Sequence, residues 1–510
     1  MRKVSLNVRS ALIPTIGATL AAGALALVPS ITPASASTGE VRLFTPSPEV
    51  TMTVHNQGPD QWVDFNPAIY LKAIGARFEI DVRRTSFYRP LRALVSTGGA
   101  PRTIPTTMLN GWQGIQSAFV LTWRNPDGSQ VSRTNVSWCP NDGQASPLSP
   151  SSASRTVFTW GCGYNPFTRS QRWGIDQGWA RQVLSYGINT PDPATLGDKA
   201  LLDVSMRQDL ADILQIPASD RTLHLHVTID RVTDPVDPPP GPTPATSSAS
   251  PETVTSSASS ERRVAPRLSA SAPPSNALPD LIPLPAYGMS THHEPSADYL
   301  DFAATVYNAG PGPLVAEGYR RGSQLVMDAY QRFYIGARLV GTLPVGTMQY
   351  DSRPTHQHWH FEDFAVYDLV NKAGHRVRSS GKEAFCLAPT DGIDLLRPGA
   401  SVNPGNGDLS TACGDITSIW VREVLASGWG DTYTQQRAGQ SINISTLPNG
   451  TYWLRITANP ADRLHETRTS NNVSLRRIVI GGTFGARRVW VPPVGQVDSE
   501  KIYFSQCCAP

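Results

Sequence analysis

The sequence predicts an all-β protein made of two β-sandwich-like domains joined by a linker rich in proline and serine. Three observations support this fold class: apolar residues recur at every second position in short runs, glycine and proline separate the runs, and a long central stretch is poor in large apolar residues. Alternation broken by short turns favours a β-sandwich over a fold with alternating helices. At 510 residues the chain is long enough for two cores.

The N-terminus has the order of a secretory signal peptide. Basic residues precede an apolar run at 11–28, and small residues follow at 34–36. Prolines and glycines interrupt the run, and no later segment approaches the roughly 20 apolar residues that a membrane span needs. We therefore expect a signal peptide at residues 1–36. The mature protein should be soluble and secreted, extracellular or associated with the cell wall, with no membrane attachment after cleavage.

Composition divides the rest of the chain. Residues 233–279 are rich in Pro, Ser, Thr and Ala and cannot bury enough apolar surface to offset their ordering entropy, so we expect a linker there. An N-terminal β-rich domain should occupy 40–232, a second domain 280–482, and a C-terminal tail 483–510. The net charge of +3 over this length gives no indication of nucleic-acid binding.

Two segments illustrate the strand pattern. In "YLDFAATVYNAGPGPL" alternate residues from Leu300 to Val306 fall on one side of a strand, which "NAGPGP" then ends. In "LPNGTYWLRITANP" an Asn-Gly turn opens a strand whose residues Tyr452, Leu454 and Ile456 share one face. The exception is 201–214, whose pattern allows a short helix.

Export places the six cysteines in an oxidising compartment, where they are expected to pair. Proximity in sequence favours Cys139 with Cys162 and Cys386 with Cys413. Cys507 and Cys508 are adjacent, so a bond between them would be strained, and their partners stay open.

The two halves resemble each other weakly, which suggests an old duplication. The segment "FVLTWRNPDGSQVSRTNVSWC" can be laid over "FAVYDLVNKAGHRVRSSGKEAFC", because each runs strand, turn, strand and cysteine. A second cysteine, a Gly-Trp pair and a late strand ("TLHLHVTID", "TYWLRITAN") follow in each half. Chance similarity between two β-rich domains is the alternative. The N-terminal copy would lack the chemistry described below and have a binding or structural role, since Asn135 stands where the second copy has Lys382.

The most informative stretch is "RPTHQHWHFEDF", in which His356, His358 and His360 occupy every second position. Side chains alternate faces along a strand, so all three imidazoles should point the same way and can converge on one ion. Imidazole suits copper, zinc, iron and nickel, and three protein ligands leave open positions for substrate, water or O2. In "TLHLHVTID", by contrast, His224 and His226 alternate with a clean apolar face and should face solvent.

The stretch "HQHWHFEDFAVYDLVNKAGHRVRSSGKEAFCL" resembles the copper-binding segment of the lysyl oxidase family. That segment runs from an H-x-H-x-H strand through Tyr-Asp-Leu to a lysine just before Phe-Cys-Leu. Further on, "GWGDTYTQQRAGQSINISTLPNGTYWLRITANPADRLHETRTSNNVSLR" is similar to the family's second half, with its Asp-Thr-Tyr, its Asn-Gly turn and its Asn-Asn strand. The similarity covers roughly Leu278 to Gly482.

The resemblance implies Cu2+ at the three histidines and a lysine tyrosylquinone cross-link between Lys382 and Tyr433. It implies a protein-lysine 6-oxidase-like reaction, in which peptidyl lysine or another primary amine is oxidatively deaminated to an aldehyde, with O2 consumed and hydrogen peroxide and ammonia released. A nearby carboxylate should act as the general base. Asp363 is the residue we assign, with Glu362 and Asp431 as alternatives.

Two departures from the family pattern stand at the site. Thr355 occupies a position where relatives have a cysteine, which removes a disulfide, and Gly381 occupies a position where they have a histidine. Other functions therefore stay open. The chain could be a non-catalytic extracellular protein that binds metal or a surface polymer, or a zinc hydrolase that uses the same histidine triplet.

Overall fold

The computed structural model describes residues 39–57, 60–184, 190–233, 266–353, 357–381, 384–401, 411–437 and 439–500. The expected signal peptide, most of the expected linker, Thr355, His356, Lys382, Cys507 and Cys508 lie outside these ranges. Within them the protein is nearly all β, with thirty strands and one α-helix, which confirms the predicted fold class. No helix in the described part is long and apolar enough to cross a membrane.

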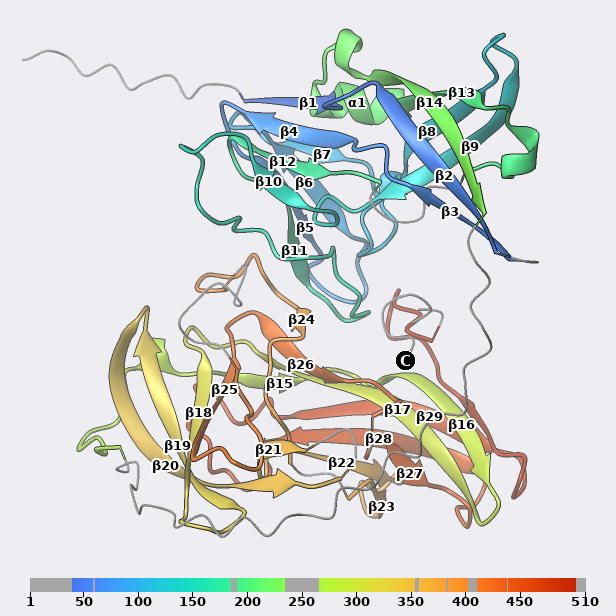
Figure 1. The fold of residues 1–510 in the computed structure, drawn as a ribbon. Coiled ribbons are helices and arrows are strands. Elements are labelled where there is room, and N and C mark those ends of the chain that lie inside the picture. Colours follow the sequence, from blue (N-terminus) through green and yellow to red (C-terminus); the bar gives the residue numbers. More distant parts are fainter. Residues whose placement is uncertain are drawn as a thin grey trace, which may run out of the picture. The chain divides into compact units, whose positions relative to one another are not determined.

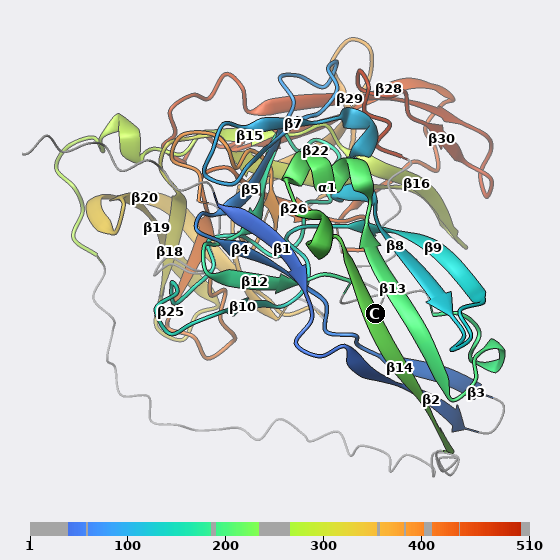
Figure 2. The same ribbon diagram turned by 90° about the horizontal axis from the view of Figure 1, so that it is seen from above.

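The N-terminal half has fourteen strands in three sheets, and α1 (Gln208–Leu214) follows β13. The sheet orders are β1-β4-β12-β10, β11-β5-β6-β7 and β3-β2-β14-β13-β8-β9. In the last sheet β14 lies between β13 and β2, and it runs parallel to β2 (Figure 2). The strand bounds are β1 (Glu40–Phe44), β2 (Glu49–Gln57), β3 (Asp60–Phe65), β4 (Tyr70–Ile74), β5 (Phe78–Arg83), β6 (Arg92–Ser96), β7 (Arg102–Ile104), β8 (Ile115–Arg124), β9 (Gln130–Trp138), β10 (Ala145–Pro147), β11 (Ser170–Ile175), β12 (Trp179–Gln182), β13 (Lys199–Met206) and β14 (Thr222–Thr233).

The C-terminal half also forms three main sheets (Figure 1). Their orders are β15-β17-β26-β24, β21-β20-β19-β18-β25 and β23-β22-β28-β29-β30, and β16 and β27 also pair with β17. The strand bounds are β15 (Leu281–Pro283), β16 (Tyr287–Glu294), β17 (Ala297–Asn308), β18 (Leu314–Arg320), β19 (Val326–Ile335), β20 (Arg338–Asp351), β21 (His358–Phe361), β22 (Ala365–Val370), β23 (Arg376–Ser379), β24 (Asp391–Gly392), β25 (Trp420–Leu425), β26 (Trp429–Tyr433), β27 (Ser441–Asn443), β28 (Gly450–Ala458), β29 (Val473–Gly481) and β30 (Arg488–Trp490).

The two halves share a topology. Twelve strands of each half correspond in chain order and in sheet order. In the first half these strands are β1 and β4 to β14, and in the second half they are β15, β17 to β20, β22 to β26, β28 and β29. Among these strands, neighbours within a sheet pair antiparallel in both halves. The disulfides also stay within the halves, as Cys139–Cys162 and Cys386–Cys413, which are the pairs that proximity predicted. A shared strand order and cysteine pairing within each half are what a duplication would produce.

The correspondence of the late strands differs by one strand from the sequence interpretation. "TLHLHVTID" is β14 and "TYWLRITAN" is β28, but the sheet orders match β28 with β13 and β14 with β29. Both β13 and β14 alternate buried residues with less buried ones, so the pattern by itself does not distinguish them.

Individual strand predictions can be checked against burial. Alternate residues of β17 from Leu300 to Val306 and of β28 from Tyr452 to Ile456 are buried in one core, as predicted. In β14 the apolar face is buried and His224 and His226 are exposed. In the segment 201–214, the helix begins only at Gln208, because β13 continues to Met206.

Contacts of the C-terminal half extend beyond the expected bounds of 280–482. The backbone amide of Ser269, in the expected linker, donates to Thr342 O in β20 at 3.0 Å. In the expected tail, β30 pairs with β29 and adds a strand to its sheet. The sheets that position the site therefore draw on residues on both sides of the expected domain.

Candidate metal centre and tyrosine site

The histidine strand is β21, which pairs with the end of β20 so that Asp351 lies opposite His358. Trp359 and Phe361 are fully buried in the core on one face of this strand. Because side chains alternate, His358 and His360 lie on the other face, as the spacing predicted.

The two described histidines converge. Their Nε2 atoms are 2.9 Å apart and their rings cross at 70°. Two nitrogens that each bind an ion at about 2.0 Å and at a right angle would be about 2.8 Å apart. Right angles between ligands are typical of tetragonal Cu(II), so the pair fits copper, and a distance of 2.9 Å also fits a hydrogen bond between two neutral imidazoles.

Asp351 lies behind His360. Its Oδ2 is 3.6 Å from His360 Nδ1, and His360 is 2% exposed. A carboxylate at the distal nitrogen orients an imidazole and leaves Nε2 for a metal. Arg353 also pairs with this carboxylate, with Nε 2.9 Å from Oδ1. Among the described residues no group of three His, Cys, Asp or Glu side chains is placed to hold a metal, and His356, the expected third ligand, lies outside them.

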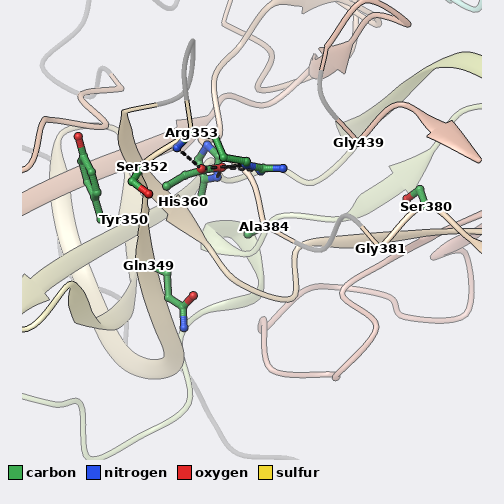
Figure 3. Close-up of a pocket in the computed structure, with 10 residues that line it drawn as sticks. Gln349, Tyr350, Ser352, Arg353, His360, Ser380, Gly381, Ala384 and Gly439 are labelled. Carbon is green, nitrogen blue, oxygen red and sulfur yellow. Dashed lines mark hydrogen bonds and ion pairs between the residues drawn. The ribbon is translucent and has the colours of Figure 1, made fainter. Parts of the chain in front are cut away.

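A cleft of about 370 Å³ opens beside His360 (Figure 3). Gly381 and Ala384, which flank Lys382 and Glu383 in the sequence, line the same cleft. The rest of its lining is Gln349, Tyr350, Asp351, Ser352, Arg353, Ser380 and Gly439. The structure therefore brings both sides of the expected cross-linking lysine to the cleft that contains a histidine of the triplet.

The segment 385–387 connects this cleft to Tyr433. The Tyr433 hydroxyl donates to Cys386 O and accepts from Cys386 N–H, both at 3.1 Å, and the Phe385 ring meets the Tyr433 ring edge-on. On its other side Phe385 pairs with Phe361, next to His360. Tyr433 is thus held against the segment that follows Lys382, despite the long loop between them in sequence.

The Cys386–Cys413 disulfide braces the histidine strand from the same side. Trp359 N–H donates to Cys413 O at 3.0 Å, and Trp359 Nε1–H donates to Asp415 O at 2.8 Å. The segment around Cys413 therefore ties β21 to the segment that carries Cys386. The strand is therefore braced through the Cys386–Cys413 disulfide.

The three candidate bases lie in different surroundings. Asp363 has φ +57° and forms an ion pair with Arg463 at 2.7 Å. Glu362 accepts a hydrogen bond from Thr347 Oγ1. Asp431 is buried in β26 two positions before Tyr433, so the two side chains leave the same face of that strand. The structure therefore associates Asp431 with the tyrosine.

A fourth carboxyl, Glu423 in β25, was missed by the sequence analysis. It is fully buried and lies near Tyr433, whose pKa burial raises well above the ordinary value. Strand alternation in "WVREVL" could have found it, because it falls between Val421 and Leu425 on the apolar face.

Part of the chain is similar to known proteins. Residues 343–489 match the family model described as Lysyl oxidase. The chain is 28% identical to lysyl oxidase homolog 2 of chicken (Gallus gallus) over 138 residues, which is 27% of this chain and 15% of the relative. It is 26% identical to lysyl oxidase homolog 2 of Homo sapiens over 138 residues, with the same two shares. With lysyl oxidase homolog 4 of Mus musculus it is 28% identical over 137 residues, or 27% of this chain and 16% of the relative. The matched segment thus spans about 15% of the length of these relatives, and the C-terminal half of the chain carries a domain of the lysyl oxidase family.

Proposed function

We propose that this protein is a secreted copper amine oxidase that converts peptidyl lysine or other primary amines to aldehydes, with hydrogen peroxide and ammonia as by-products. The observation that carries the proposal is a continuous set of contacts. His358 and His360 converge at 2.9 Å, His360 shares a cleft with the residues flanking Lys382, and the next residues of that segment hold the Tyr433 hydroxyl.

In this proposal His356, His358 and His360 hold copper, and Asp351 orients His360. Copper and a lysine tyrosylquinone formed from Lys382 and Tyr433 would supply the electron sink and the O2 chemistry of amine oxidation. The donor set fits, because neutral imidazoles are good copper ligands and the Nε2 atoms already point at one place.

The surroundings of Tyr433 suit a residue that must be converted once and then protected. Burial raises the pKa of its phenol, so the hydroxyl stays protonated and donates to Cys386 O. Phe385 packs against the ring and excludes water from that side. These contacts hold the ring in one place.

Among the carboxylates we propose Asp431 as the general base, because it leaves the same strand face as Tyr433. Asp363, the residue first assigned, is instead engaged with Arg463 in an ion pair. A carboxylate that shares a face with the reacting ring can reach a substrate bound to it, whereas one held by an arginine must first break that pair.

An extracellular location also belongs to this proposal. The two disulfides fit an oxidising compartment. The partners would be lysine side chains of extracellular or cell-surface proteins, or small primary amines, together with O2.

The deciding experiment uses the full chain expressed with copper or with zinc. Copper-loaded protein should show a visible quinone band that phenylhydrazine shifts, and it should release peroxide from primary amines, while zinc-loaded protein should show neither. Metal binding without the band would favour a non-catalytic binding protein. Hydrolytic activity of the zinc form would favour a hydrolase, and either result would refute the oxidase.

A further inference from the structure

Glu423 stands where the fold calls for an apolar residue. In β25 it lies between Val421 and Leu425 on the buried face of the strand, opposite Ala316 of β18, and it has no solvent exposure. A buried carboxyl is costly unless it is paired, hydrogen-bonded or neutral, so its partners decide its state.

Its partners do not include a cation among the described residues. Oε2 accepts a hydrogen bond from Leu387 N–H at 3.0 Å, and the backbone of Phe361 also acts on the carboxyl, while Oε1 itself has no hydrogen-bond partner within the described residues. The charged side chain that acts on it is Asp431, which is also acidic. Burial beside another carboxyl favours the protonated form, and accordingly burial raises the pKa of Glu423 well above its ordinary value.

The adjacent strand provides a contrast. Glu317 in β18 is equally inaccessible, at 2% exposure, but Arg422 Nη2 lies 2.7 Å from its Oε1 and Arg332 Nε lies 3.4 Å from its Oε2. Glu317 is therefore paired with two arginines, while Glu423 is equally buried and has no cation beside it among the described residues.

The N-terminal half shows what the fold itself needs at this position. Trp173 stands six positions before the tryptophan of its Gly-Trp pair, as Glu423 does in the second half, and it lies opposite Ile80 in the corresponding strand pair. Trp173 is fully buried, and its one polar group, the indole N–H, donates to Cys162 O at 2.9 Å. The shared scaffold thus accepts a large uncharged side chain there, so packing alone does not require the acid in the second half.

The reason is found in the contacts of the neighbouring peptide. Glu423 accepts a hydrogen bond from the amide N–H of Leu387. The preceding residue, Cys386, hydrogen-bonds to the Tyr433 hydroxyl through both its N–H and its C=O. We propose that Glu423 is a positioning residue of the tyrosine site, a neutral acid that holds the Cys386–Leu387 peptide in place around the Tyr433 oxygen. The positioning role of Glu423 is independent of catalysis. Its consequence for quinone formation rests on the proposed function.

The first test uses copper-free protein and needs no catalysis. Infrared difference spectra of wild type against Glu423→Gln at neutral pH should show loss of a protonated carboxyl band. Glu317→Gln, which removes a buried carboxyl paired with two arginines, is the matched control and should leave that protonated band in place. A spectrum in which Glu423→Gln removes a carboxylate band would overturn the neutral acid.

The second test measures position. Hydrogen exchange of the peptide containing Leu387 should be unchanged in Glu423→Gln, which keeps an acceptor oxygen, and at least about 10-fold faster in Glu423→Leu, which has none. The carbonyl of Leu387 is held separately by Val424 N–H at 3.3 Å, so the leucine variant should stay folded. Equal protection of the Leu387 amide from exchange in both variants would refute the positioning role. If the leucine variant fails to fold, the infrared result still tests whether Glu423 is a neutral acid.

The third test adds copper. Glu423→Gln should form quinone at a rate within about 2-fold of wild type, and Glu423→Leu should be at least about 10-fold slower with the same copper content. A leucine variant with the wild-type rate would overturn the role in cofactor formation. If wild-type protein forms no quinone, the proposed function fails, while the infrared and exchange results still judge the positional claim.

Discussion

Phe361 and Phe385 exchange two backbone hydrogen bonds, at 2.8 Å and 3.0 Å, although they belong to segments far apart in the sequence. Phe361 follows His360 directly, and Phe385 precedes the Cys386 peptide that holds Tyr433. This pair therefore fixes the spacing between the candidate metal ligands and the candidate cofactor residues without using any side chain of either group.

His358→Ala should lower copper content by at least about 10-fold without unfolding the protein, because the side chain is half-buried and makes its described polar contact with His360. Metal analysis after dialysis measures it. His226→Ala is the matched control, since His226 also alternates on a strand but is exposed. Equal copper loss in both variants would argue against the triplet.

Asp351→Asn should weaken copper binding by about 10-fold, because the amide holds the distal nitrogen of His360 less firmly than a carboxylate does. A competitive chelator titration gives the affinity. An unchanged copper affinity would show that Asp351 pairs with Arg353 but does not orient the His360 imidazole.

Tyr433→Phe should abolish the quinone band and leave copper content unchanged. Loss of the hydroxyl also leaves the Cys386 amide and carbonyl without this partner, so the free energy of unfolding should fall by about 1–2 kcal/mol. Lys382→Ala should likewise abolish the band. Tyr452→Phe, which removes a hydroxyl that donates to Pro448 O at 2.8 Å, should keep it. Turnover in the Tyr433 variant would contradict the assignment.

Glu423→Gln should flatten the dependence of stability on pH. The folded-state pKa of Glu423 is raised above its unfolded value, so the folded protein keeps a proton that the unfolded chain releases, and wild-type stability falls as pH rises between the two values. The variant should therefore gain stability relative to wild type as pH rises above the ordinary pKa of a glutamate carboxyl. Denaturant titrations of both proteins at mildly acidic and at neutral pH test this, and a constant difference in stability would exclude a raised pKa.

Replacing both Cys386 and Cys413 by serine should lower the free energy of unfolding by roughly 3.5 kcal/mol on the chain-entropy model, given their separation of 27 residues. It should also reduce copper content, because Trp359 bonds to Cys413 O beside the histidines. The Cys139–Cys162 double replacement should have a similar effect on stability, given its separation of 23 residues, and leave copper binding intact. Equal copper loss would point to general unfolding.

Local pattern was enough to predict the strands, the face on which His358 and His360 lie, and the two disulfides, since each depends on alternation or proximity along the chain. The pairing of Phe361 with Phe385 and the contacts of the Tyr433 hydroxyl depend on which distant segments meet, and a single sequence does not encode that in its periodicity. The late strands were matched one strand out of step for the same reason: β13 and β14 have similar alternation and differ in their neighbours. Glu423 was readable from its place between Val421 and Leu425.

Because the two halves share a topology, the first half can be used as a reference for the second. Where the second half has Tyr433, Asp431 and Glu423, the first has Val183, Arg181 and Trp173 at the same spacing from its Gly-Trp pair, all of them buried. Because the same strand topology forms with either set of three residues, folding depends on the strands and not on the reactive side chains. Each of these three residues can therefore be substituted into the first half in turn. Each variant would measure what that side chain adds to a fold that forms without it.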